Sequence, residues 1–377
     1  MRTTPFSLPL GALLLALAAC GGAATPASSS APPVSATASG KPAVSASAPV
    51  SAAASAKPAA SAAASAKPSA LTVVRMGPPS VDLNYQLPFV VAKAKGYFQS
   101  EGIDAQMNLV AGNVAVPALL KGEIDLTNHG AAMQATMQGA GSMKSIYFPY
   151  NTSTLNLTVN TAKIKQPSDL IGQPVAVDTL GNSQDLGTRA ILKSLGVDPQ
   201  KVDIRPIQNS NNRVAAMISG QVVASADNPS LVAQELAHGG FKVLASSAQV
   251  FRIPWSGYAA TSQYIADHHA TLLGWERAMV KALVFVRQNP DETVDIVNQQ
   301  TGLDKEIAKQ ALPLLLDVMD PNDPGGFTEE AMRNQIEMTK QNIPNARDAS
   351  IDEVADAGPV REAQKSLGIH CKGGYKC

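Results

Sequence analysis

The 377-residue sequence predicts an α/β protein made of two similarly built lobes. From about residue 71, short apolar runs alternate with segments of helical periodicity, an order typical of mainly parallel sheets with helices on both faces. In addition, the segment that begins at Ala118 aligns without a gap with the segment that begins at Ala216. Both segments pass through the same order of helix, strand, turn and helix. The identities are Ala118/Ala216, Gly122/Gly220, Ala135/Ala233, Gly141/Gly239 and Lys144/Lys242.

The elements expected before residue 161 follow this alternation. Apolar and β-branched runs predict the strands, apolar residues three and four positions apart predict the helices, and glycines such as Gly96 mark helix ends. The expected strands are 71–77, 103–110, 123–127, 145–150 and 154–160. The expected helices are 83–96, 114–122 and 131–139.

The same order recurs in the second half of the chain, which then becomes helical. Thr328, followed by Glu329 and Glu330, predicts an acidic helix start with a capping side chain. The expected strands are 173–178, 201–208, 222–227 and 241–245. The expected helices are 183–195, 213–220, 230–239, 272–289, 291–302, 304–318 and 328–342.

The first twenty residues indicate export and lipidation. Arg2 precedes the apolar core LPLGALLLALAA, which is too short for a stable membrane span but suits a cleaved signal. Leu17-Ala18-Ala19-Cys20 resembles a lipobox, in which Cys20 becomes the lipidated N-terminus; an ordinary signal peptide with a chance cysteine is the alternative. Residues 21–70 are almost entirely Ala, Ser, Pro, Gly, Val and Lys, which predicts a disordered tether.

Composition excludes some classes of function and leaves the last two cysteines open. The formal net charge is zero, so no basic field indicates nucleic acid, and after the signal core no apolar run approaches membrane length. Cys371 and Cys377 could close a small loop as a disulfide in an oxidising compartment, and metal binding with His370 is the alternative. No H-x-x-x-H or C-x-x-C spacing supports a metal site elsewhere.

Three stretches together carry a family resemblance: FVVAKAKGYFQSEGIDAQMNLVAGNVAVPALLKGEIDLTNHG, PSDLIGQPVAVDTLGNSQDLGTRAILKSLGVDP and VADAGPVREAQKSLGI. Over roughly residues 72–369 the chain resembles the substrate-binding lipoproteins of ABC transporters for nitrate, alkanesulfonates, taurine and thiamine pyrimidines. The resemblance implies a two-lobed periplasmic-binding-protein fold, type II like, with crossing strands near 154–161 and 249–261. It places lobe I at 71–160 and 250–377, and lobe II at 161–249.

A ligand cleft is expected at the carboxyl ends of the strands, where the predicted turns meet. The turn VDTLGNSQDLG is no nucleotide loop, because Gly181 and Gly187 are one residue too far apart and Thr188-Arg189 replaces the lysine. We interpret it as a solute-binding helix N-terminus, capped by Ser183, with Asn182 facing the cleft. The expected ligand-binding residues are Ser80, Gly112, Asn113, His129, Gly130, Thr179, Gly181, Asn182, Ser183, Asn209, Asp227, Asn228 and Tyr258.

Several of these residues have a structural alternative. His129 either contacts the ligand or bonds to local backbone, and Asp227 with Asn228 either faces the ligand or forms a helix cap or hinge contact. Trp255 either stacks on a solute or packs in the core. The sequence requires no arginine in the cleft and offers Arg213 as a candidate, whereas Trp255 and Tyr258 would suit a neutral aromatic, so the choice between an anionic and a heteroaromatic solute stays open.

The resemblance implies a binding protein that delivers a small solute to an ABC permease and its ATPase. We expect a monomer held in the cell envelope by its lipid, facing the periplasm or exterior, without cofactor, metal or nucleic acid. A membrane-tethered sensor is one alternative. An enzyme similar to the eukaryotic pyrimidine synthase is another, but the cysteine-rich iron motif of that enzyme has no counterpart here.

Overall fold

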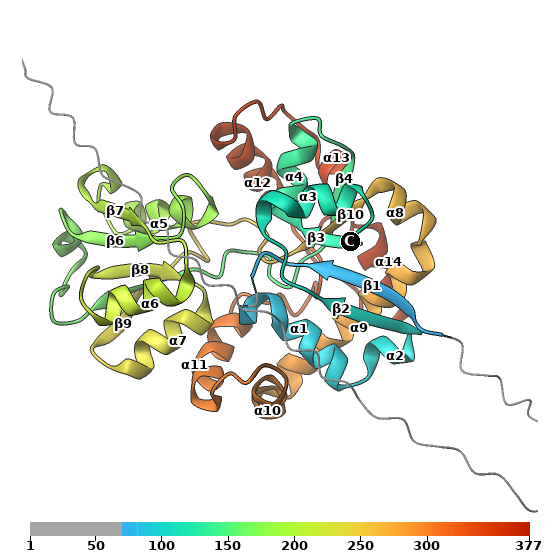
Figure 1. Ribbon diagram of the computed structural model, residues 1–377, viewed down its shortest axis with the longest axis horizontal. Helices are drawn as coiled ribbons and strands as arrows, with labels where there is room; N and C mark the ends of the chain where they lie inside the picture. The colour runs from blue at the N-terminus through green and yellow to red at the C-terminus, as the bar shows by residue number, and fades with distance from the viewer. Residues whose placement is uncertain (1–69, 81) are drawn as a thin grey trace, which may run out of the picture. The chain divides into compact units, whose positions relative to one another are not determined.

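The computed structural model describes residues 70–80 and 82–377 (Figure 1). The predicted signal peptide, the lipidated Cys20 and the tether up to residue 69 lie outside the described residues. Among the helices that are described, none is long and apolar enough to span a membrane.

The first sheet is mainly parallel and contains residues from both halves of the chain. Its strands are ordered β2-β1-β3-β10-β4; β1 is parallel to β2 and β3, whereas β10 is antiparallel to β3 and β4. The strands are β1 (Thr72–Gly77), β2 (Ile103–Met107), β3 (Leu126–Asn128), β4 (Met143–Tyr147) and β10 (Tyr258–Thr261).

The second sheet repeats this arrangement. Its order is β7-β6-β8-β5-β9, with β6 parallel to β7 and β8, and with β5 antiparallel to β8 and β9. In both sheets, therefore, the antiparallel strand is the one that the chain forms on arriving from the other sheet. The strands are β5 (Asn156–Asn160), β6 (Pro174–Val177), β7 (Asp203–Pro206), β8 (Ala224–Asp227) and β9 (Phe241–Ser246).

Helices surround each sheet, and we call each sheet with its helices a lobe (Figure 1). Lobe II carries α5 (Ser183–Ser194), α6 (Ser210–Ile218), α7 (Pro229–His238) and the short 3₁₀ turns Pro167–Leu170 and Pro199–Lys201. Lobe I carries α1 (Leu83–Ala94), α2 (Tyr97–Ser100), α3 (Gly112–Leu120), α4 (His129–Met137), α8 (Ser262–Asp267), α9 (His269–Gln288), α10 (Pro290–Thr301), α11 (Lys305–Leu316), α12 (Glu329–Asn342), α13 (Ile351–Val354) and α14 (Gly358–Ser366).

The aligned glycines have the same structural role in the two lobes. Gly122 follows α3 with φ +70°, and Gly220 follows α6 with φ +74°, a conformation that glycine adopts without steric cost. In both lobes the chain then enters the third parallel strand, β3 or β8. The two-lobe prediction from the internal alignment is therefore confirmed.

Two segments carry the chain between the lobes. Residues 148–155 lead from β4 to β5, and residues 247–257 lead from β9 to β10. The segments pair with each other: Tyr150 forms an antiparallel bridge with Trp255, and the Ser247 N–H donates to the Leu155 carbonyl at 2.9 Å. Residues 156–160, which we assigned to lobe I, pair instead in the second sheet, because the first crossing is complete before Asn156.

The core of lobe I is built on α9. Trp275 on this helix is completely buried and lies edge-to-face against Tyr147 and Tyr258 of the sheet, with ring centroids 5.3 and 5.8 Å away. Ala233 of α7, in lobe II, belongs to the same buried apolar cluster. The lobes are therefore in apolar contact along α7 as well as joined by the two crossings.

Candidate functional site

The two lobes meet at the carboxyl ends of their parallel strands, and Asn228 ties both crossings to that junction. Its Oδ1 accepts hydrogen bonds from Thr154 Oγ1 at 2.8 Å and from Trp255 Nε1 at 3.2 Å. Thr154 lies in the first crossing and Trp255 in the second. The oxygen of Asn228 thus makes a hinge contact, the structural alternative that we raised for this residue.

Behind Asn228, Asp227 forms a buried ion pair with Arg213. Asp227 is fully buried, and its Oδ1 is 2.7 Å from Arg213 Nη2 and accepts from Gln184 Nε2 at 3.0 Å; Ser225 Oγ donates to Oδ2. Arg213 also donates to the carbonyls of Ile207 and Gln208. Both charged groups therefore already have partners within lobe II, so Asp227 does not face a ligand as we predicted.

A second buried carboxyl group, Glu235 of α7, lies near this ion pair. Neither oxygen has a hydrogen-bond partner among the described residues. Burial raises the pKa of Glu235 to about 9, and the negative charge of Asp227 acts in the same direction. Glu235 is therefore protonated at neutral pH.

The residue that caps the N-terminus of α5 is not the one that we predicted. Asn182 is the cap: its Oδ1 accepts from the N–H groups of Gln184 and Asp185, both at 3.0 Å, and its Nδ2 donates to Asp178. Ser183 is the first helical residue and not the cap. Asn and Ser are about equally favoured as caps, but Asn182 has the extended backbone of an N-cap and Ser183 is already helical, so Asn182 takes the position that we gave to Ser183.

Carboxylates of the protein itself occupy the same helix start. Asp185 Oδ2 accepts from the Gly181 N–H at 2.8 Å, and Asp185 Oδ1 pairs with Arg189 at 2.8 Å. Asp178 is half-buried beside the cap, and burial raises its pKa. The N–H groups that we expected to attract a solute anion thus already bind an Asn oxygen and a carboxylate. Gly187 lies inside α5 and does not belong to the turn before it.

On the side of lobe I, polar residues at the strand ends contact the second crossing or one another. Asn84 Nδ2 donates to Ser256 Oγ at 2.6 Å, whereas Asn84 Oδ1 is buried without a partner among the described residues. Asn128 caps α4 by accepting from the Ala131 N–H at 3.1 Å, and it also donates to the Tyr85 hydroxyl.

His129 and Tyr258 belong to the interior of lobe I. His129 is buried, its ring lies 4.8 Å from that of Phe148, and burial lowers its pKa to about 3, so the ring is neutral. Its backbone N–H donates to the Gly257 carbonyl at 3.1 Å, which is the local-backbone alternative. Tyr258 is fully buried between Tyr85 and Trp275. Neither side chain lines either of the two junction cavities described below.

The remaining predicted residues lie in turns at the strand ends. Ser80 Oγ accepts from the Asp82 N–H at 3.4 Å, Thr179 is exposed, and Asn209 caps α6 by accepting from the Asn212 N–H. Gly112 and Asn113 begin α3. Trp255 is half-buried, and its indole N–H is bound to Asn228, so it is a hinge contact as well as a core residue.

Two cavities flank the junction, and each has walls from both lobes. The first, which we call the α5 cavity, has a volume of about 180 Å³ and brings together Gly130, Gly181, Asn182 and Ser183 with residues of α12. The second, the α1–α7 cavity, has a volume of about 350 Å³ and lies between α1 of lobe I and α6 and α7 of lobe II. Residues that line it include Asp82, Gln86, Asn211, Ser230 and Gln234.

Sequence reasoning missed Asp82 and the α12 residues. Asp82 occupies the N-cap position of α1 but its side chain accepts no capping bond. A break such as Pro-Pro-Ser before a helix signals a strand end, so Asp82 could have been included. Gln335 and Thr339 on α12 come from a distant part of the chain, and only the packing of α12 against α4 brings them to the α5 cavity.

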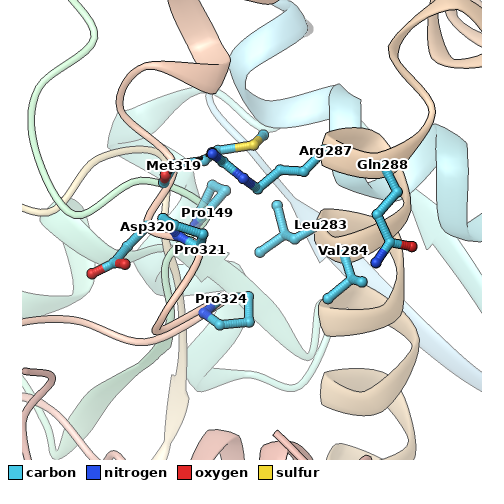
Figure 2. Close-up of a pocket in the computed structure, with 9 residues that line it drawn as sticks. All are labelled: Pro149, Leu283, Val284, Arg287, Gln288, Met319, Asp320, Pro321 and Pro324. Atoms are coloured by element: carbon cyan, nitrogen blue, oxygen red, sulfur yellow. Dashed lines mark hydrogen bonds between the residues drawn. The ribbon is translucent and has the colours of Figure 1, made fainter. Parts of the chain in front are cut away.

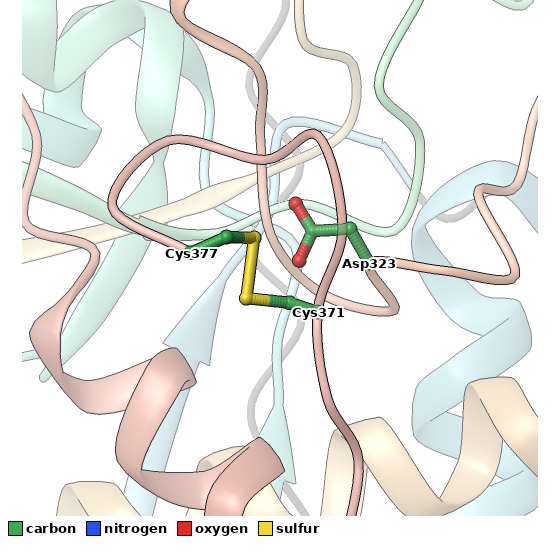
Figure 3. A group of neighbouring side chains, drawn as sticks. All are labelled: Asp323, Cys371 and Cys377. Atoms are coloured by element: carbon green, nitrogen blue, oxygen red, sulfur yellow. A yellow bond between two sulfur atoms is a disulfide. The ribbon is translucent and has the colours of Figure 1, made fainter.

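The last two cysteines form a disulfide in the structure, with Cα atoms 5.5 Å apart (Figure 3). The side chain next to them is that of Asp323 and not His370. Asp323 is buried and already pairs with Arg361, and it also accepts from Gln364 Nε2 at 2.9 Å. An acid engaged in this way beside a closed disulfide does not favour the metal alternative.

A further cavity of about 190 Å³ lies in lobe I away from the junction (Figure 2). Leu283, Val284 and Arg287 of α9 face a proline-rich loop across it. Arg287 donates to the carbonyls of Leu316 and Met319, so its charge is used to hold the loop. None of the residues that we predicted as ligand contacts lines this cavity.

Comparison with solved structures shows the class of fold. The chain is 18% identical to the periplasmic aliphatic sulphonate binding protein SsuA from Escherichia coli, with a TM-score of 0.60 over 78% of this chain and 97% of that one. A putative periplasmic sulfonate-binding protein SsuA from Methylobacillus flagellatus is 17% identical, with a TM-score of 0.63 over 80% of this chain and 96% of that one. The desulfurization enzyme DszB is 12% identical, with a TM-score of 0.58 over 78% of this chain and 99% of that one. The fold is therefore that of two-lobed periplasmic binding proteins, which an enzyme also uses.

A sequence model of one protein family matches the chain. The NMT1/THI5-like model matches residues 84–293, which is more than half of the chain, and the protein belongs to that family. No curated protein matches the chain.

We predict that Asn182→Ala destabilises the folded part and Ser183→Ala does not. Loss of an N-cap side chain costs about 0.5–2 kcal/mol, whereas Ser183 makes no capping bond. Urea unfolding of both variants measures the difference. Equal losses, or a larger loss for Ser183→Ala, would show that the cap assignment is wrong.

A second prediction concerns Glu235. Its pKa is raised from about 4.3 in an unfolded chain to about 9 when folded, so the folded state keeps a proton that the unfolded state loses. The stability that comes from the proton bound by Glu235 in the folded state is complete below about pH 4 and is lost as the pH rises toward 9. Glu235→Gln, which keeps no titrating group, should gain stability relative to the parent by roughly 1 kcal/mol per pH unit across that window.

Urea unfolding at pH 6, 7.5 and 9 tests this dependence. Glu306→Gln on the exposed surface of α11 is the matched control and should follow the parent. If the free energy of unfolding changes with pH in the same way for Glu235→Gln and the parent, Glu235 is ionised in the folded protein and the prediction is wrong.

Proposed function

We propose that this protein is the extracytoplasmic solute-binding component of an ABC importer. In this proposal it captures a small solute at the junction of its lobes and delivers it to a membrane permease that an ATPase drives. Membership of the NMT1/THI5-like family and the fold shared with the two SsuA proteins support it. The observation that carries it is a junction with two cavities, each lined by residues of both lobes.

The hinge supports the same proposal. Both crossings are short, pair with each other and bind the one Asn228 oxygen, which fixes where the lobes bend. Closure of two such lobes around a solute is a known domain motion. A solute that contacts residues of both lobes stabilises the closed form, and a permease can then recognise that form.

A binding role fits the junction better than the enzymatic alternative. DszB shows that the fold can carry catalysis. In this chain, however, Asp227 is held by Arg213, and His129 is a neutral ring packed against Phe148. Neither group has the paired nucleophile and base that acid–base or covalent catalysis requires. A membrane-tethered sensor remains the second candidate, and a permease and ATPase encoded beside this gene would favour the importer.

A thermal-shift screen tests binding and its location. Sulfonates, carboxylates, nitrate, pyrimidines and amines are tested as solutes; one present at 100 times its dissociation constant should stabilise the fold by about 2.7 kcal/mol. Ser183→Trp fills the α5 cavity, Asn211→Trp fills the α1–α7 cavity, and Lys193→Trp on the exposed far end of α5 is the control. One of the two cavity variants should abolish the shift while the control keeps it. A shift that survives both cavity variants would place the site elsewhere.

We propose that Cys20 anchors the mature protein in the cell envelope, facing the periplasm or exterior. Cys20→Ala should move the protein from the membrane to the soluble fraction, because the lipid is its attachment, and should leave the melting temperature of the folded part unchanged. Fractionation and mass spectrometry of the mature N-terminus measure this. A variant that still sediments with membranes would contradict the lipobox assignment.

A further inference from the structure

The charges at the junction are unbalanced toward carboxylate. Asp82, Asp178 and Asp227 gather around Arg213: Gln184 accepts from the Asp178 N–H at 3.1 Å and donates to Asp227 Oδ1, so one side chain links the two acids. Asp82 lies on the lobe I side of the junction, where it lines the α1–α7 cavity with Ser230, and its negative charge acts on Arg213 together with those of Asp227 and Asp178. Three acids thus share one guanidinium, which is already paired with Asp227.

The α1–α7 cavity shows the consequence of this imbalance. Of the side chains that line it, Asp82 is the charged one; the polar others are amides and hydroxyls, and Leu83, Leu231 and Leu303 supply an apolar wall. The α5 cavity has no charged side chain in its lining. An anion placed in either cavity would lie near carboxylates without a cation to pair with, and an unpaired buried charge is costly.

A second, independent feature indicates that a hydrogen-bond donor is missing. Asn84, the second residue of α1 and two residues from Asp82, is 2% exposed, and its Oδ1 has no partner among the described residues. Its Nδ2 donates to Ser256 Oγ, next to Trp255, so the amide lies against the second crossing and is adjacent in sequence to Leu83 of the cavity wall. A carbonyl oxygen accepts and does not donate, and a buried one without a donor is destabilising.

We propose, on the basis of the proposed function, that the solute is a small organic cation with N–H donors, such as a protonated amine or guanidine, and that Asp82 in the α1–α7 cavity binds its charged nitrogen. The cation compensates the excess carboxylate charge, and the leucines contact its carbon chain. Burial raises the pKa of Asp82 and the charge of Asp227 acts in the same direction, and the opposing effects of Ser80, Arg213 and Asn228 do not cancel this rise. The volume of about 350 Å³ suits a small molecule.

The test compares solutes of matched size and different charge. Small primary amines and guanidines are titrated against the full mature protein, each beside an alkanesulfonate and a carboxamide with the same number of carbons. Calorimetry and thermal shift are the measurements. The amine or guanidine is expected to bind at least tenfold more tightly than both matched compounds.

Asp82→Asn is the decisive variant, because it removes the charge without removing a capping bond or changing the size of the side chain. It should weaken cation binding at least tenfold. Asp203→Asn is the matched control: this exposed acid of lobe II pairs with Arg205 at 2.6 Å, and cation binding should not change. Melting temperatures without solute show whether both variants are folded.

The outcomes separate this inference from the proposed function. If sulfonates or carboxamides bind as well as the amines, or if Asp82→Asn binds amines like the parent, the cation proposal is wrong and the binding-protein proposal stands. If no compound of the wider solute panel binds, the binding-protein proposal is contradicted as well.

Discussion

The hydrogen bonds that the Asn228 side chain accepts from both crossings are the constraint on which the arrangement of the lobes depends. Thr154 and Trp255 are about a hundred residues apart, and each begins or ends a passage between sheets. Because one amide oxygen binds both, the end of β8 is positioned against both passages at once. Asp227 immediately precedes it and carries the ion pair with Arg213. The hinge contact and the charged group of lobe II are thus neighbours in sequence, at the end of the same strand.

This geometry determines what the junction offers to a solute. A buried guanidinium beside a binding site ordinarily attracts anions. Here Asp227 and two backbone carbonyls already use the donors of Arg213, and Gln184 and Ser225 bind the opposing carboxylate. The pair therefore acts as one rigid, nearly neutral unit that supports Asn228. The charge that a solute meets is that of the surrounding acids.

The sequence predicted the fold well because the fold depends on patterns that repeat. Alternating strand and helix patterns, with glycines such as Gly122 and Gly220 after corresponding helices, identify two similar lobes without any knowledge of tertiary contacts. We predicted that lobe I extends to residue 160, which is too far along the chain, because the strand pattern of residues 154–160 would fit either sheet. Only pairing with β8 and β9 shows that they belong to lobe II.

The site was predicted less completely, for a physical reason. A Gly-Asn-Ser turn before a helix shows that free N–H groups exist there, but it does not show which acceptor reaches them first. At α5 the acceptors are Asn182 and Asp185 of the same turn, which bind these N–H groups themselves. Residues such as Asp82 and Gln335 reach the cavities only through packing between distant helices. Strand-end turns therefore locate the junction, whereas the charge that a solute experiences there depends on which side chains the protein has already paired.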